Sequence, residues 1–135
     1  MKIMLDAHGG DFGIETTVTG AIEAANDLKD DTIILIGPEK EIWNFLHEKF
    51  SFPDNIEIIN ATDNIEMHES PTLSIKKKVN SSIVKGFNYL KNDDVDAFVS
   101  CGNTGAVMTG AFTIVGRIKG IQRPAISTYF PTKSE

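Results

Sequence analysis

The sequence is poor in cysteine, in long apolar runs and, over its first half, in basic residues. Its single cysteine, Cys101, excludes an internal disulfide, and no group of Cys and His residues has the spacing of a metal site. No apolar run approaches the ~18 residues that span a membrane. Residues 1–11 lack the apolar core of a signal peptide and reach an acid at Asp6, so we expect a cytoplasmic protein.

Acidic and basic residues are divided unevenly along the chain. Residues 1–70 hold 15 acidic and 4 basic residues, for a charge of −11, whereas residues 71–135 hold 4 acidic and 9 basic residues, for +5. The net charge of −6 disfavours nucleic acid as a partner. The basic half predicts a local positive surface for an anion or an acidic partner, and ordinary solvated charge is the alternative.

Apolar runs with β-branched residues alternate with segments of helical periodicity along the 135 residues, the length of one ordinary domain. We predict strands at residues 2–7, 31–37, 55–61, 95–101 and 123–130, and helices at residues 15–28, 38–50, 70–92 and 104–116. Gly86 and the polar triplet at 80–82 argue against one straight helix over 70–92. Strands joined through helices form a parallel sheet with helices on its faces, so we expect one α/β domain over residues 1–135, incomplete at its C-terminus.

The stretch DAHGGDFG follows the first predicted strand. Asp6 closes the strand, Gly9 and Gly10 allow a backbone path that other residues resist, and Asp11 either caps the next helix or faces a ligand. Ligands of open α/β sheets bind beyond the carboxyl ends of the strands, which places His8 where it can touch a ligand. A tight turn with a capping aspartate is the alternative.

A second glycine-containing loop, residues 102–105, connects a predicted strand to a predicted helix. Such a loop aims backbone N–H groups and the positive end of a helix dipole at one point, which suits phosphate or another oxyanion. Asn103 and Thr104 add side-chain donors. The loop is neither a Walker loop nor a dinucleotide fingerprint, because Gly-Lys-Ser/Thr and the G-x-G spacing are missing. An N-capped turn is the alternative, and Cys101 fits a small buried apolar residue better than a nucleophile.

Two further stretches concentrate polar and charged residues. Residues 65–82 combine acids with three consecutive lysines and two serines, and at most one or two of these lysines can face one site from a helix. Residues 116–124 hold three bases and no acid. A solvated helix face explains the first stretch equally well.

The stretches DAHGGD, IEMHESP…KKKVNSS, SCGNTGAVM and GRIKGIQRPAIS occur in this order. Together they resemble the bacterial phosphate acyltransferases of phospholipid synthesis, from residue 2 to about residue 132. The resemblance implies transfer of a fatty acyl group from acyl carrier protein to inorganic phosphate, which yields acyl phosphate, with no metal or organic cofactor. It also implies a three-layer α/β/α fold like that of phosphotransacetylases and of isocitrate and isopropylmalate dehydrogenases. Finally, it implies a homodimer that can sit at the inner membrane surface.

The resemblance assigns roles to residues at matching positions. Those expected to bind phosphate or the acyl substrate are Asp6, Gly9, Gly10, Asp11, Ser81, Ser82, Gly102, Asn103, Thr104 and Gly105. The candidates for a catalytic role are Asn103, Thr104 and Lys78. The residues expected at a carrier-protein or dimer interface are Arg117, Lys119 and Arg123.

The chain departs from the family pattern in three residues and in length. His8, His68 and Cys101 stand where the family usually has Met, Asp and Ala. Family members are considerably longer, so the chain matches their N-terminal portion. Two alternatives remain: a non-catalytic fragment that keeps anion or carrier-protein binding, and a phosphotransacetylase-like enzyme that uses a coenzyme A thioester.

Overall fold

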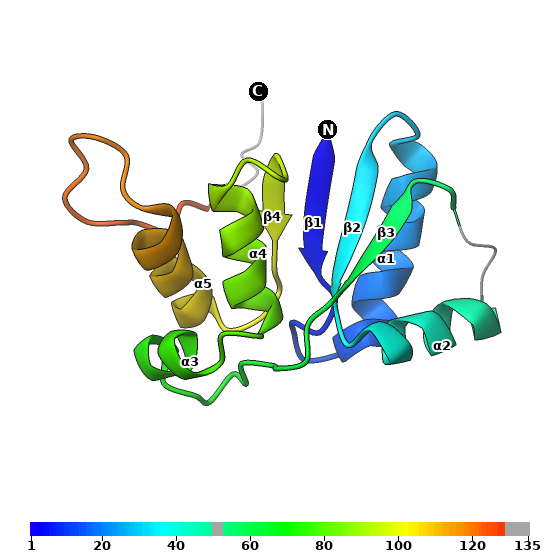
Figure 1. Ribbon diagram of the computed structural model, residues 1–135, viewed down its shortest axis with the longest axis horizontal. Helices are drawn as coiled ribbons and strands as arrows, with labels where there is room; N and C mark the ends of the chain where they lie inside the picture. The colour runs from blue at the N-terminus through cyan, green and yellow to red at the C-terminus, as the bar shows by residue number, and fades with distance from the viewer. Residues whose placement is uncertain (50–52, 129–135) are drawn as a thin grey trace, which may run out of the picture.

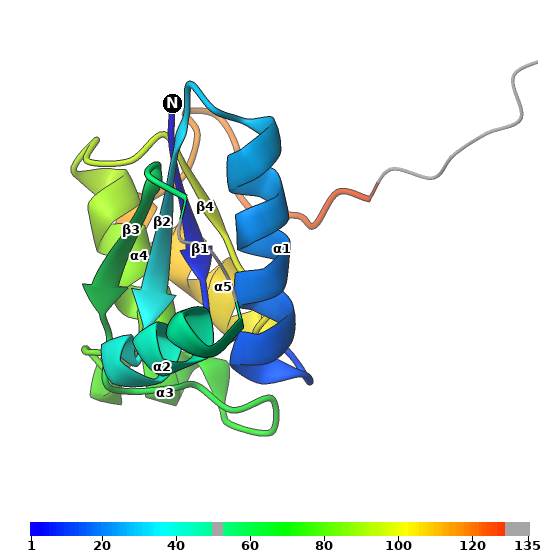
Figure 2. The same ribbon diagram turned by 90° about the vertical axis from the view of Figure 1, so that its right-hand side faces the viewer.

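The computed structural model describes residues 1–49 and 53–128. In this part of the chain a parallel four-stranded sheet, with strand order β3-β2-β1-β4, lies between two layers of helices (Figures 1 and 2). The strands are β1 (Lys2–Asp6), β2 (Thr32–Gly37), β3 (Ile56–Asn60) and β4 (Ala97–Val99). The helices are α1 (Gly13–Asp27), α2 (Glu39–Lys49), α3 (Pro71–Lys77), α4 (Ser82–Lys91) and α5 (Thr104–Gly110), which continues as the π-helical turn η1 (Ala111–Val115). None of these described helices is both long and apolar enough to cross a membrane.

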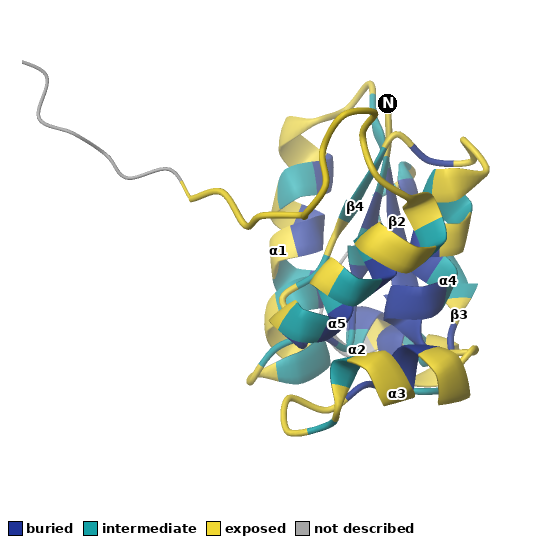
Figure 3. Cartoon of the chain, turned by 90° about the vertical axis from the view of Figure 1, so that its left-hand side faces the viewer, coloured by how far each residue is buried: buried dark blue, intermediate teal, exposed yellow. Residues whose placement is uncertain are grey.

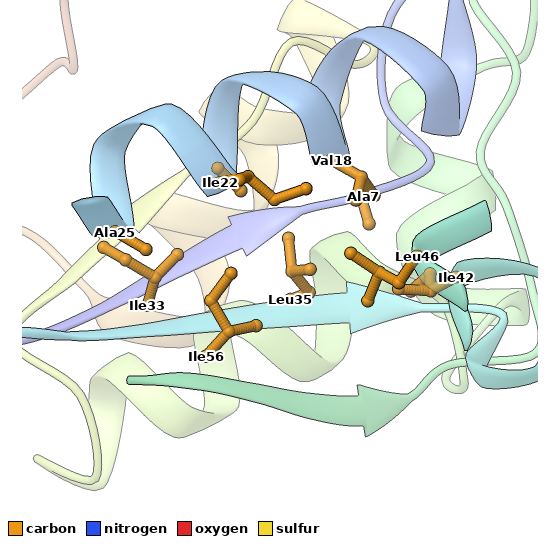
Figure 4. Packing of buried hydrophobic residues seen from close by; sticks show 10 residues of the cluster. Ala7, Val18, Ile22, Ala25, Ile33, Leu35, Ile42, Leu46 and Ile56 are labelled. Atoms are coloured by element: carbon orange, nitrogen blue, oxygen red, sulfur yellow. The ribbon is translucent and has the colours of Figure 1, made fainter. Parts of the chain in front are cut away.

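The apolar run of β2 explains why both faces of the sheet are covered. Side chains alternate across a strand, so Ile33 and Leu35 face one layer while Ile34 and Ile36 face the other. Figure 4 shows Ile33 and Leu35 beneath α1, with Ile42 and Leu46 of α2 at the Leu35 end. The cluster on this face is completed by Ala7, Val18, Ala21, Ile22, Ala25, Ile42, Leu46 and Ile56.

The opposite face is covered mainly by α4. Its Phe87 meets Phe98 of β4 edge to face, with 5.1 Å between ring centroids, and Ile83 lies in the same cluster. Met4 of β1 packs on this side with Ile34. The alternating strand and helix segments predicted from the sequence are confirmed as an α/β fold, with shifts of one to a few residues at most ends.

The helix predicted over residues 70–92 is two helices, as the polar triplet indicated. α3 ends at Lys77, with Lys78 as its C-cap. The backbone becomes extended at Ser81, whose hydroxyl accepts a hydrogen bond from the Val84 N–H at 3.3 Å. Serine favours this N-cap position because its short side chain satisfies a backbone donor that the helix leaves free. The break turns α4 onto the sheet while α3 stays beneath α5 (Figure 1).

The strand predicted at residues 123–130 is wrong over residues 123–128, and residues 129–130 lie outside the described residues. The chain leaves η1 at Gly116, with φ of 104°, and residues 116–128 are exposed along their length (Figure 3). This segment runs away from the sheet instead of along β4 (Figure 2). Among the described strands β4 lies at the edge of the sheet, but residues 123–128 do not lie along it, and a strand pattern forms a strand only where the segment meets a partner.

Replacing Gly86 by alanine should destabilise the fold, whereas the same change at Gly20 should stabilise it. A Cβ at Gly86 would lie 2.4 Å from the Phe98 ring, which Phe87 holds in place, but a Cβ at Gly20 meets nothing within 4 Å. We expect Gly86→Ala to lower the free energy of unfolding by about 1–2 kcal/mol and Gly20→Ala to raise it by about 0.5–1 kcal/mol. Urea unfolding followed by circular dichroism measures both, and changes of the same sign would contradict this packing.

Candidate functional site

The carboxyl ends of β1 and β4 lie at the topological switch point of the sheet, where the strand order reverses. β1 pairs with β2 on one side and with β4 on the other. The chain leaves β1 for α1, which packs on one face of the sheet, and it leaves β4 for α5, which packs with α4 from the opposite layer. Two loops therefore separate here, and open α/β sheets bind their ligands at such a point. We call residues 7–12 the first glycine loop and residues 100–103 the second glycine loop.

A buried carboxylate joins the two loops. Asp6 is 1% exposed, and its Oδ2 accepts a hydrogen bond from Ser100 Oγ at 2.8 Å. Ser100 Oγ in turn accepts one from the Gly102 N–H at 3.1 Å, while Asp6 Oδ1 accepts from the His8 N–H at 3.2 Å. Asp6 therefore links the two loops, because its oxygens accept hydrogen bonds from a group of each loop.

Gly9 and Gly10 allow the two loops to pack in direct contact. A Cβ at Gly9 would lie 2.6 Å from Asp6 Oδ2 and 2.8 Å from the Gly102 nitrogen, so no side chain fits there. Gly10 has φ of 99° and lies against Cys101, whose Cβ would be 3.2 Å from a Cβ at Gly10. The structure thus brings together Asp6, Gly9, Gly10 and Gly102, four of the residues expected to bind phosphate.

Asn103 is buried, and its side chain is fully engaged with the protein. Its Oδ1 accepts a hydrogen bond from the Ala106 N–H at 2.9 Å, which caps α5. Its Nδ2 lies within 3.0–3.3 Å of the carbonyl oxygens of Glu66, Met67 and Glu69. Asn103 therefore links the second glycine loop to the segment before α3. Its side-chain amide has no free donor left for a ligand.

The next two predicted residues differ in their surroundings. Thr104 is exposed at the first position of α5. Gly105 packs on α3, because a Cβ there would lie 2.6 Å from Cγ of Pro71. Of the residues at the start of α5, Thr104 is therefore the one whose side chain can reach a ligand beside the loops.

The predicted Lys78, Ser81 and Ser82 lie where α3 gives way to α4. Lys78 forms a salt bridge with Glu69 and donates to the Asn64 carbonyl oxygen at 2.6 Å. Ser81 caps α4, and Ser82 is buried with an Oγ that has no hydrogen-bond partner among the described residues. Lys78 is thus engaged with a carboxylate, whereas Lys76 and Lys77 are exposed.

The Glu69 carboxylate has two side-chain donors. Hydrogen bonds from Lys78 and then from Ser74, the latter at 2.8 Å, hold the pKa of Glu69 below its usual value of 4.5. Because the Glu69 carbonyl also lies beside Asn103, this cluster orders the segment against which the second glycine loop rests.

The predicted interface residues Arg117, Lys119 and Arg123 lie on the exposed segment after η1 and away from the glycine loops (Figure 1). The Arg117 guanidinium lies over the Phe112 ring at 5.5 Å and donates to the Gln122 carbonyl oxygen at 3.3 Å. These bases are therefore available to a partner, not to a ligand at the sheet.

The first glycine loop borders a pocket of about 240 Å³. Its walls include Gly9, Gly10 and Asp11 from the loop, Thr16 from α1, and Cys101. Asp11 is the charged residue among those that line it, and no lysine or arginine does so within the described ranges. Within the described ranges, an anion in this pocket could therefore be bound only by backbone N–H groups and hydroxyls. In residues 1–49 and 53–128 no group of His, Cys, Asp and Glu is arranged to hold a metal ion.

Two residues of the site were missed by reasoning from sequence. Ser100 bridges the loops, and Thr17 donates from Oγ1 to the Ala7 carbonyl oxygen at 2.6 Å, which fixes the first glycine loop to α1. Ser100 had a visible signal, because it is a polar residue at the end of an apolar strand. Thr17 had none, since a threonine within a helix is ordinary.

Comparison with known proteins agrees with the resemblance read from the motifs. A family model described as "Fatty acid synthesis protein" matches residues 1–135, and the chain belongs to that family. Its relatives include proteins named phosphate acyltransferase. The one from Dictyoglomus thermophilum is 50% identical over 100% of this chain and 40% of its own length. Those from Halothermothrix orenii and Herpetosiphon aurantiacus are 44% and 45% identical, over 99% and 98% of this chain and 40% and 36% of their own lengths. The chain thus spans about 40% of such relatives.

Substitution of Asn103 should weaken the fold according to which of its hydrogen bonds is lost. We expect Asn103→Ala to lower the free energy of unfolding by about 2 kcal/mol, since it removes both the α5 cap and the donors to buried carbonyls. Asn103→Asp keeps the cap but loses the donors, so proteolysis should accelerate within residues 66–69 in both variants. Urea unfolding and limited proteolysis test this, and an Asn103→Ala variant as stable as the parent would contradict the role of Asn103 as a link.

The Glu69 cluster should make stability depend on pH. Because the pKa of Glu69 is lowered by folding, its contribution is fully present above pH 4.5 and is lost as the pH falls through the lowered pKa. Between about pH 6 and about pH 3 the parent should lose more stability than Glu69→Gln, which has no carboxylate to protonate. Urea midpoints at the two pH values measure the difference, and equal losses would contradict it.

Proposed function

We propose that this chain is the N-terminal portion of an acyltransferase that moves a fatty acyl group from acyl carrier protein to inorganic phosphate. The observation that carries the proposal is the match of the whole chain, at 50% identity, to a protein named phosphate acyltransferase. The meeting of two glycine loops at the β1–β4 boundary supports it, because such a point suits a small oxyanion. The enzyme acts in the cytoplasm, and its product, acyl phosphate, serves phospholipid synthesis.

The reaction needs positioning and charge stabilisation more than a protein nucleophile. An oxygen of hydrogen phosphate attacks the thioester carbonyl carbon, a C–O bond forms, and the carbonyl oxygen becomes an oxyanion. The intermediate then collapses, the C–S bond breaks, and the leaving thiolate takes the proton that the phosphate loses. In this proposal the backbone N–H groups of Asn103 and Thr104 and the Thr104 hydroxyl donate to these oxygens, because the Gly102 N–H is already bonded to Ser100. Asp6 and Ser100 hold the loop in place and act as positioning residues.

The carrier protein docks on the exposed basic segment in this proposal. Arg117, Lys119 and Arg123 carry three positive charges, and Ile118 beside them is 80% exposed. Complementary charge guides an acidic partner, and exposed apolar side chains hold it. The same surface serves the two remaining expectations, a homodimer and contact with an anionic membrane. Sedimentation and flotation with anionic vesicles measure these two properties separately.

The activity test compares this chain with a chimera in which the remaining sequence of the Dictyoglomus thermophilum relative follows residue 135. Each is given acyl carrier protein thioester and inorganic phosphate, and acyl phosphate is measured as its hydroxamate. We expect activity in the chimera and little or none in the chain alone, because the chain spans 40% of the relative. A chimera that is inactive with carrier-protein thioesters but active with coenzyme A thioesters would overturn the proposal.

Substitution of Gly9 tests whether the loops are the site. A Cβ at Gly9 collides with Asp6 and with the Gly102 nitrogen, so Gly9→Ala must separate the loops. We expect the chimera carrying Gly9→Ala to form acyl phosphate about 100-fold more slowly, since a displacement of about 1 Å has effects of that size. Glu23→Ala, an exposed change on α1, is the matched control and should leave the rate unchanged. Equal rates for both variants would place the chemistry elsewhere.

A further inference from the structure

An open apolar groove of about 320 Å³ runs between α1 and the strands β1 and β4. Small residues on α1, among them Gly20 and Ala24, create the space, and Leu5 of β1 and Val99 of β4 form the floor. Val99, the last residue of the edge strand β4, is apolar and 46% exposed. Among the described residues, α1 packs on β1 and β2, which leaves Val99 of β4 beside the helix open to solvent.

The groove joins the pocket at the first glycine loop. Thr16, Thr17 and Cys101 line both. Polar groups gather at this shared end, whereas the rest of the groove is lined by apolar side chains. No charged residue lines the groove within the described residues. The Thr17 hydroxyl proton is bound to the Ala7 carbonyl oxygen at 2.6 Å, so even this residue brings no free donor to the groove.

A groove that is polar at one end and apolar along the rest fits a ligand with a polar head and an apolar tail. From Thr17 to Ala24 the helix rises about 10 Å, which gives the groove the length of a medium alkyl chain. Such a chain would cover Val99 and the α1 surface around Gly20 and gain from the removal of apolar area from water. A ligand lying here has its polar end at Cys101, beside the backbone of Gly10.

We propose that this groove holds the fatty acyl chain, with the reacting carbonyl at the Cys101 end and the methyl end beside Ala24. The proposal rests on the function proposed above, because it takes the glycine loops as the place where phosphate and the acyl carbonyl meet. It assigns the chain-length preference of the enzyme to α1, and in particular to the absence of a side chain at Gly20.

Cys101 allows a binding test that does not depend on catalysis. It is the single cysteine of the chain and is exposed. The rate at which a water-soluble thiol reagent modifies Cys101 is measured against increasing concentrations of inorganic phosphate, butyl, hexyl, octyl and decyl phosphate, and decanol, each below its aggregation threshold. The chain and the chimera are both used, and the cysteines of the added sequence are replaced by serine in the chimera.

We expect protection of Cys101 to strengthen by about twofold for each added methylene up to about eight carbons, because the open groove buries part of each methylene. Gly20→Phe fills the groove, so it should abolish the dependence on chain length while leaving protection by inorganic phosphate unchanged. Gly20→Ala should retain most of the dependence. Glu23→Phe adds the same ring to the same helix outside the groove and should retain all of it.

Two results would overturn the proposal. One is equal protection by all chain lengths, or a dependence that persists in Gly20→Phe. The other is a dependence present in the chain but absent from the chimera, because the added sequence then covers the groove. If decanol protects as well as decyl phosphate, and inorganic phosphate does not protect, the groove stands as an apolar subsite while the proposed phosphate site fails.

Discussion

The contact between the first and second glycine loops depends on one buried carboxylate. Asp6 ends β1 beneath both loops, and its two oxygens are bonded to the Ser100 hydroxyl and to the His8 N–H. A buried carboxylate with a hydrogen-bonded oxygen on each side orients whatever donates to it, since leaving a donor unpaired there is unfavourable. The glycine at position 9 then lets the backbones approach. Loss of the carboxylate or of the glycine is therefore expected to separate the two loops.

This arrangement divides the polar residues of the motifs into two groups. Asn103, Ser81 and Lys78 satisfy backbone groups or a carboxylate within the protein. Thr104, by contrast, remains exposed to solvent. A motif rich in Asn, Ser and Thr therefore does not consist of ligand-binding side chains alone, because much of its polarity holds a glycine-rich backbone in an unusual path.

Reasoning from sequence predicted the layers of the fold and two glycine loops at the carboxyl ends of strands, and the structure brings these loops together. It failed where the structure of a segment depends on residues far away in the sequence. The run of β2 and the polar break before α4 are local signals, so both were predicted. The segment from 123 to 128 has the residues of a strand but does not lie along the edge strand β4, and no local pattern reveals this. The likeness to dehydrogenases and phosphotransacetylases stays a prediction. The internal roles of Asn103 and Ser100 also depend on residues tens of positions away.

The pairing of β1 with β4 also fixes when the site can form during folding. β1 meets β2 across a short connection, Ile3 opposite Ile33, but it meets β4 only when Ile3 comes opposite Ala97. Closing the longer loop costs about 1 kcal/mol more in chain entropy. During synthesis on the ribosome, β1 can pair with β4, and Asp6 can bond to Ser100, only after β4 has emerged. The two halves of the site belong to the earliest and the latest parts of this sheet to be synthesised, so the site is completed last.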